Sequence, residues 1–183
     1  MRTYLLIALS LAALLQICRS EGSEKDKRSA RPSPGFSTYR NNRFGFEVSY
    51  PKTWKVHKAD NGDGMTTRSD NREWRVFSEL VRDDGDEEIL SSKRILDLLE
   101  HSVKPYIQPS EIKRTKTIMV NDRYRRTRRE GVIGYYRKNG NDIIHMVTKD
   151  DQLFYQAIAT NMDEETVLKL LKSYAITRGG EKQ

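Results

Sequence analysis

The stretch from Arg43 to Val56 constrains the fold more than any other part of this 183-residue chain. Between residues 44 and 50 every second residue is apolar or aromatic: Phe44, Phe46, Val48 and Tyr50. This two-residue period predicts a half-buried β-strand. Pro51 has no backbone N–H to give to a neighbouring strand, so the strand should end there. We expect these side chains, together with Trp54, to form the core at the start of a domain.

The first twenty residues differ in composition from the rest of the chain. Arg2 precedes an almost unbroken apolar run at residues 5–15. A helix that crosses a bilayer needs about 20 apolar residues, so this run is too short for a membrane anchor. It is typical of a secretory signal peptide, which we assign to residues 1–20. We therefore expect an exported protein, either periplasmic or secreted.

Cys18, the single cysteine of the chain, leaves two alternatives for the mature N-terminus. Small side chains at Cys18 and Ser20 fit simple cleavage before Glu21. Residues 15–18, Leu-Gln-Ile-Cys, also resemble a bacterial lipoprotein box, in which the cysteine is lipidated and anchors the protein to a membrane. Ile17 departs from the small residue that usually precedes that cysteine. In both cases the folded part lacks cysteine, so it can form no disulfide and use no thiol.

The remaining chain fits one domain with a moderate positive charge. Removal of residues 1–20 takes away two arginines and no acid, which lowers the net charge from +7 to +5. Residues 21–38 are polar and poor in apolar side chains, which predicts a disordered linker. We place the folded domain at residues 39–178 and a short disordered tail at 179–183.

Strands and helices both follow from the pattern of the domain. Segments 65–68 and 73–81 predict a hairpin, and residues 83–88 an acidic loop. Ser91 or Ser92 can cap a helix that Pro105 stops. Residues 112–160 predict a four-stranded antiparallel meander, with turns at Asn121-Asp122, Asn139-Gly140 and Asp150-Asp151.

The last predicted element is a helix that Asp163, Glu164 and Glu165 open. Acids in its first turn suit the helix dipole. Its buried stripe is expected to comprise Val167, Leu170, Leu171 and Tyr174. The resulting class is α+β, with one antiparallel sheet and helices packed against it.

Both ends of the domain resemble PsbP-like domains. Residues 39–56, YRNNRFGFEVSYPKTWKV, are similar to the aromatic-Gly-aromatic strand, Tyr-Pro and Trp with which those domains open. The closing sequence 173–176, Ser-Tyr-Ala-Ile, is similar to their Ser-Phe-apolar end, and the loop 61–64 resembles exported bacterial members of unknown function. The resemblance implies an α/β/α sandwich around a central antiparallel sheet. It also implies a binding or assembly module, since most members of the family are of that kind.

A basic run is the strongest candidate for a binding surface. Its members are Lys113, Arg114, Lys116, Arg123, Arg125, Arg126, Arg128 and Arg129. On two adjacent strands these cations could bind phosphates or anionic lipid headgroups. Strand alternation should place Arg126 and Arg128 on one face and Arg125 and Arg129 on the other. The alternative interpretation is a solvated strand that pairs with the acidic loop at 83–88.

Other chemistry-bearing residues are not arranged as known sites. The acids at 60–63 and 83–88 lack the alternate-residue spacing of a calcium loop. His57, His101 and His145 are far apart in sequence and have no neighbouring ligand at metal spacing. The chain contains no Gly-x-Ser-x-Gly elbow and no glycine-rich phosphate loop. These observations predict neither metal, cofactor nor catalytic residue.

The function predicted from the sequence is an exported, non-catalytic binding or assembly module of the cell envelope. Its expected partner is another envelope protein or an anionic membrane surface, and a nucleic acid is not expected. Two alternatives stay open. One is an envelope enzyme whose site is formed by residues distant in sequence, and the other is a basic-patch binder of anionic surfaces.

Overall fold

The computed structural model describes residues 34–80, 94–150 and 153–177. They belong to the second of the two units into which the chain divides, residues 32–183. The predicted signal peptide with Cys18, most of the predicted linker, the acidic loop, the two serines predicted to cap the first helix and the predicted tail lie outside the described residues. No described helix is long and apolar enough to cross a membrane.

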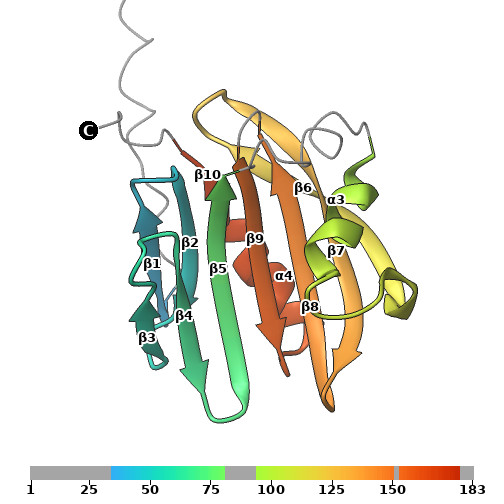
Figure 1. The fold of residues 1–183 in the computed structure, drawn as a ribbon. Coiled ribbons are helices and arrows are strands. Elements are labelled where there is room, and N and C mark those ends of the chain that lie inside the picture. Colours follow the sequence, from blue (N-terminus) through green and yellow to red (C-terminus); the bar gives the residue numbers. More distant parts are fainter. Residues whose placement is uncertain (1–33, 81–93, 151–152, 178–183) are drawn as a thin grey trace, which may run out of the picture. The chain divides into compact units, whose positions relative to one another are not determined.

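The described residues form ten strands in a single sheet (Figure 1). These strands are β1 (Phe36–Asn41), β2 (Phe46–Pro51), β3 (Lys55–Lys58), β4 (Gly64–Ser69), β5 (Arg72–Leu80), β6 (Arg114–Asp122), β7 (Thr127–Lys138), β8 (Asn141–Lys149), β9 (Leu153–Thr160) and β10 (Ala175–Ile176). Their order across the sheet is β1-β2-β10-β6-β7-β8-β9-β5-β4-β3. The helical elements are α3 (Ile95–Val103), the 3₁₀ turn η1 (Pro109–Glu111) and α4 (Glu164–Ser173).

The opening segment forms the core as predicted, although its strand starts two residues late. Phe44, Phe46, Val48 and Trp54 are all buried. Phe44 belongs to the loop before β2, because its N–H donates to Asn41 Oδ1 (3.0 Å) and Gly45 takes a φ of 65°. Pro51 is the last residue of β2, as expected.

β1, which was not predicted from the sequence, pairs with the whole of β2 in antiparallel register. It starts at Phe36, so the predicted linker ends too late. The partly buried Phe36 and Tyr39 pack against the core. This short strand was not predicted because it directly follows a segment that contains Pro and Gly, which is typical of a linker.

The predicted hairpin and the four-stranded meander are both present. β4 and β5 pair around Asp70 and Asn71, and β6 to β9 pair in chain order. Asn139 and Gly140, both with positive φ, connect β7 to β8. Such a two-residue turn matches the twist of the strands it joins.

The helices lie on opposite faces of the sheet. On β7, Ile133 faces the core beneath α4, while Val132 faces the core beneath α3. Figure 1 shows α3 in front of β7 and β8 and α4 behind the sheet. The α+β class is therefore confirmed. The predicted α/β/α sandwich matches only loosely, because the sheet curls strongly and the Tyr39 hydroxyl of β1 donates to the Gly64 carbonyl of β4 (3.1 Å).

The helix ends differ in how they are capped. Arg94 is the N-cap of α3, and its side chain makes no capping hydrogen bond. Asp163 caps α4 by accepting from Thr166 N–H (2.8 Å). Val167, Leu170 and Leu171 form the predicted buried stripe. Tyr174 is buried too, but it has left the helix.

Candidate functional site

The basic run lies along the β6–β7 hairpin, but its turn comes later than predicted. β6 continues through Asn121 and Asp122, and residues 123–126 make the turn. The prediction was wrong because Asn121 and Asp122 also pair with β10, which keeps their backbone extended. Asp122 then closes the turn, since its Oδ1 accepts a hydrogen bond from Arg125 N–H (2.9 Å).

This shift changes where the arginines point. Arg125 and Arg126 belong to the turn, where Arg126 has a φ of 56°, so strand alternation does not apply to them. Arg128 and Arg129 do alternate on β7. Arg128 is exposed, whereas the Arg129 side chain is only 17% exposed. The predicted division of the four arginines between two faces therefore holds only for this second pair.

The run separates into two groups at opposite ends of β6. Eight residue steps from Arg114 to Asp122 span roughly 26 Å of extended strand. The first group, here called the amino-terminal group, comprises Lys113, Arg114 and Lys116. The second, the turn group, comprises Arg123, Arg125, Arg126 and Arg128. A single continuous patch is thus replaced by two surfaces.

The amino-terminal group lies against the start of α4. Glu164 Oε2 accepts from Arg114 (2.7 Å), Glu164 Oε1 accepts from Tyr135 (2.7 Å), and Lys116 lies 3.6 Å from the same carboxylate. These donors, Arg114 first, lower the pKa of Glu164. Burial and the neighbouring Glu164 raise the pKa of Tyr135 to about 12. The Arg114 guanidinium also lies 3.8 Å from the Tyr135 ring centroid.

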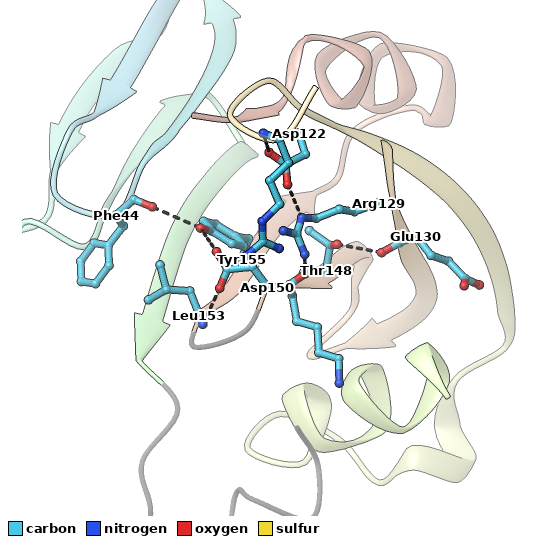
Figure 2. A network of polar contacts seen from close by, with 10 residues as sticks. Phe44, Asp122, Arg129, Glu130, Thr148, Asp150, Leu153 and Tyr155 are labelled. Atoms are coloured by element: carbon cyan, nitrogen blue, oxygen red, sulfur yellow. Dashed lines mark hydrogen bonds and ion pairs between the residues drawn. The ribbon is translucent and has the colours of Figure 1, made fainter. Parts of the chain in front are cut away.

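A buried ion pair supports the turn group (Figure 2). Asp122 Oδ2 accepts from Arg129 Nε (2.6 Å), and Arg129 Nη1 donates to the Lys149 carbonyl (3.3 Å). The Asp122 side chain is 1% exposed. Burial alone would raise the pKa of Asp122, but the hydrogen bonds from Arg125 N–H and Arg129 outweigh it, so the pKa lies below its usual value. Asp122 therefore stays ionised and fixes the turn.

A cavity of about 260 Å³ lies beside the turn. It is lined by Arg43, Phe44, Asp122, Tyr124, Arg125, Arg129, Asp150, Leu153, Tyr155, Ile176 and Thr177. These residues come from the β1–β2 loop, the end of β6, the β6–β7 turn, the start of β7, the residue after β8, the start of β9 and the end of β10. Charged, aromatic and aliphatic side chains therefore meet at one place although they are distant in sequence.

The Tyr155 hydroxyl holds one wall of this cavity in place. It donates to Asp150 Oδ2 (2.9 Å) and lies 3.3 Å from the Phe44 carbonyl. Asp150 Oδ1 accepts in turn from Leu153 N–H (2.9 Å), as Figure 2 shows. Burial, and then the Asp150 carboxylate, raise the pKa of Tyr155. The hydroxyl thus acts as a hydrogen-bond donor at neutral pH.

Sequence reasoning did not find Arg43, Asp150 or Tyr155 as members of this region. No local pattern marks them, because each reaches the cavity from a different loop or strand end. Tyr124 lies within the basic run but was not among the predicted binding residues. In the structure its side chain is 58% exposed at the tip of the turn, between Arg123 and Arg125.

The three histidines lie apart from one another. His57 is exposed on β3, and the His101 ring on α3 lies 6.4 Å from the Phe154 ring. His145 is fully buried on β8 beneath α3. No three His, Cys, Asp or Glu side chains among residues 34–80, 94–150 and 153–177 converge as metal ligands.

His145 belongs to a buried polar chain whose protons can be assigned. The Gln156 amide N–H₂ donates to the Glu79 carboxylate, so its oxygen faces His145. His145 Nε2 therefore donates to Gln156 (2.8 Å), and its Nδ1 accepts from the Tyr136 hydroxyl (3.2 Å). Burial lowers the pKa of His145 to about 4. The ring is neutral at pH 7.

Comparison with known proteins adds to the description of the fold. No protein-family model matches the chain, and no curated protein matches it. The class of protein that the structure defines is a single α+β domain on one curled, mostly antiparallel sheet. Among solved structures it is similar to the solution structure of cyanobacterial PsbP (CyanoP) from Synechocystis sp. PCC 6803. The two are 12% identical over 80% of this chain and 95% of that chain, with a TM-score of 0.49. At this identity the likeness concerns the fold alone.

Proposed function

We propose that the chain is an exported, non-catalytic binding module of the cell envelope that docks on an anionic membrane surface through its turn group. The observation that carries this proposal is the exposed, cation-rich turn around Tyr124, held by the buried ion pair of Asp122 and Arg129. The exported location comes from the predicted signal peptide.

Charge supplies the attraction. Arg123, Arg125, Arg126 and Arg128 are all exposed, and the buried Glu47 offsets the charge of Arg123, with which it forms an ion pair. Each Lys or Arg near an anionic membrane contributes about 1 kcal/mol, and this attraction falls off within a Debye length. Three such cations at one tip favour an anionic surface over a neutral one.

Tyr124 supplies the apolar contact. A tyrosine ring is apolar and its hydroxyl is polar, which suits the boundary between headgroups and acyl chains. At the tip of a turn between arginines, the ring can enter this boundary while the guanidiniums contact phosphates.

The fixed backbone of the turn reduces the ordering that binding requires. Asp122 accepts a hydrogen bond from Arg125 N–H, and Arg129 donates one to Asp122. Because the turn is ordered before binding, less conformational entropy is lost on docking than for a flexible basic tail.

Sedimentation with vesicles over a salt series tests the proposal. The full chain should bind vesicles that contain phosphatidylglycerol, bind phosphatidylcholine vesicles weakly, and lose binding as salt rises. Tyr124→Ser should bind the phosphatidylglycerol vesicles more weakly than the wild type does, but its binding should depend on salt in the same way. Equal binding to both lipids, or none to either at low salt, would refute the proposed function.

A further inference from the structure

The outer edge of β6 is open over most of its length. β6 has nine residues, and β7 pairs with all of them on one side. On the other side β10 pairs with Asn121 and Asp122 alone. Among the described residues, no strand therefore pairs with the outer edge of Arg114–Val120. An unpaired edge of this kind presents a row of backbone N–H and C=O groups.

The direction of these backbone groups follows from one hydrogen bond. Arg123 N–H donates to the Ile176 carbonyl of β10 (2.9 Å). Backbone N–H groups of a strand point to alternate sides, so those of Thr115, Thr117 and Met119 face the same edge. Neither Thr115 nor Thr117 is buried, and Met119 is 49% exposed. The edge is thus accessible as well as unpaired.

Charge indicates what could occupy the edge. Lys113, Arg114 and Lys116 border its first half, where Glu164 forms ion pairs with Arg114 and Lys116. If a second copy of the chain paired antiparallel with this edge over Arg114–Val120, Lys116 would oppose Ile118 of that copy and lie diagonally beside its Lys116. Like charges that approach each other on paired strands are destabilising. The surplus of positive charge favours an acidic occupant instead.

We propose that the outer edge of β6, over Arg114–Val120, accepts an extended acidic segment of a partner protein as an added β-strand. Main-chain hydrogen bonds provide the affinity in this mode of recognition, and side chains that flank the edge select the partner. The site goes beyond the proposed membrane contact. It uses the backbone edge of β6 and the cations at the amino end of that strand rather than the turn group, and loss of one binding event leaves the other intact.

A short synthetic peptide in which Glu alternates with Val serves as the probe, and a Lys–Val peptide serves as its control. The full chain should bind the Glu peptide. Binding should slow hydrogen exchange at the amides of Thr115, Thr117 and Met119, because these N–H groups gain partners. Lys113→Glu combined with Lys116→Glu should abolish the preference for the acidic peptide.

Thr117→Pro removes one outward N–H that no described strand uses, and proline is tolerated at such edge positions. It should weaken the peptide about tenfold, whereas the matched Thr117→Ala should retain full binding. If the proline variant fails to fold, hydrogen exchange at the Thr115, Thr117 and Met119 amides of the wild-type chain, measured with and without the Glu peptide, still tests the proposal.

Three outcomes would overturn the proposal. One is no binding of the Glu peptide at low salt, and another is equal binding of both peptides. The third is protection of the three amides that grows with protein concentration in the absence of peptide, which would indicate pairing of two copies. Phosphatidylglycerol binding measured on the same variants separates this failure from failure of the proposed function.

Discussion

The two ends of β6 hold similar ion pairs in different surroundings. At the carboxyl end, the Asp122 side chain is 1% exposed, and Arg129 contacts it at 2.6 Å. At the amino end, Arg114 and Glu164 approach as closely, at 2.7 Å, with side chains 55% and 34% exposed. Ion pairs in water contribute little to stability, while removing one partner of a buried pair is costly. The first pair therefore supports the fold, whereas the second contributes little to stability and leaves Arg114 exposed at the surface.

Arg129→Met should produce the largest effect. It leaves the Asp122 carboxylate buried without its ion-pair partner, which should lower the free energy of unfolding by about 4 kcal/mol. Urea denaturation at pH 7 measures this loss. Adding Asp122→Asn to the same chain should recover part of it, because the unpaired charge is then gone.

The matched control is Arg114→Met at the other end of β6. Its urea midpoint should stay within error of the wild-type value, since water screens the Arg114–Glu164 pair. Equal losses of stability in Arg129→Met and Arg114→Met would contradict the distinction between a stabilising buried ion pair and a screened exposed one.

A buried histidine extends the comparison of buried and exposed groups to the α3 face. The pKa of His145 is about 4 in the fold and near 6.5 in the unfolded chain. Between these values the unfolded state binds more protons than the folded state. The contribution of His145 to the free energy of unfolding is therefore fully present above pH 6.5 and is lost as the pH drops toward 4. The loss should reach about 3 kcal/mol. His145→Gln should remove this slope from urea midpoints, and the exposed His57→Gln should keep it.

Stability at acid pH should also distinguish the buried Asp122 carboxylate from the exposed Glu164 carboxylate. The pKa of Asp122 is lowered in the fold, so its contribution is complete above the unfolded value near 4 and is lost as the pH falls through the folded value. Asp122→Asn should therefore flatten the decline of stability below pH 4. Glu164→Gln, at an exposed pair, should leave the decline almost unchanged. If Glu164→Gln flattened the decline below pH 4 more than Asp122→Asn did, the ion pair at the amino end of β6 would be the source of the acid sensitivity.

Periodic segments were predictable from the sequence. Phe46 and Val48 follow a two-residue period and Val167, Leu170 and Leu171 follow the helical one, and all five are buried. These patterns report burial directly, because one face of each element must meet the core. The Asn139-Gly140 turn was predictable for a local reason, since both residues accept positive φ.

The candidate site was less predictable because tertiary pairing decides it. Asn121 and Asp122 have turn-forming side chains, yet β10 holds them in the sheet, and the arginine turn moves onward. The two-residue β10 is too short to leave a periodic signal. Arg43 reaches the cavity from a loop some eighty positions before Arg125, and no local pattern could join them.

The central claim is that the turn group is the membrane-binding surface, and a pair of charge reversals tests it most directly. Arg126→Glu with Arg128→Glu changes the turn group, and Lys113→Glu with Lys116→Glu makes the same charge change at the amino end. With phosphatidylglycerol vesicles at low salt, the turn variant should bind at least tenfold more weakly than wild type, roughly the effect of losing a few cations near the surface. The amino-end variant should lose far less. Equal losses would show that net charge alone attracts the chain, and a larger loss from the amino end would contradict the account.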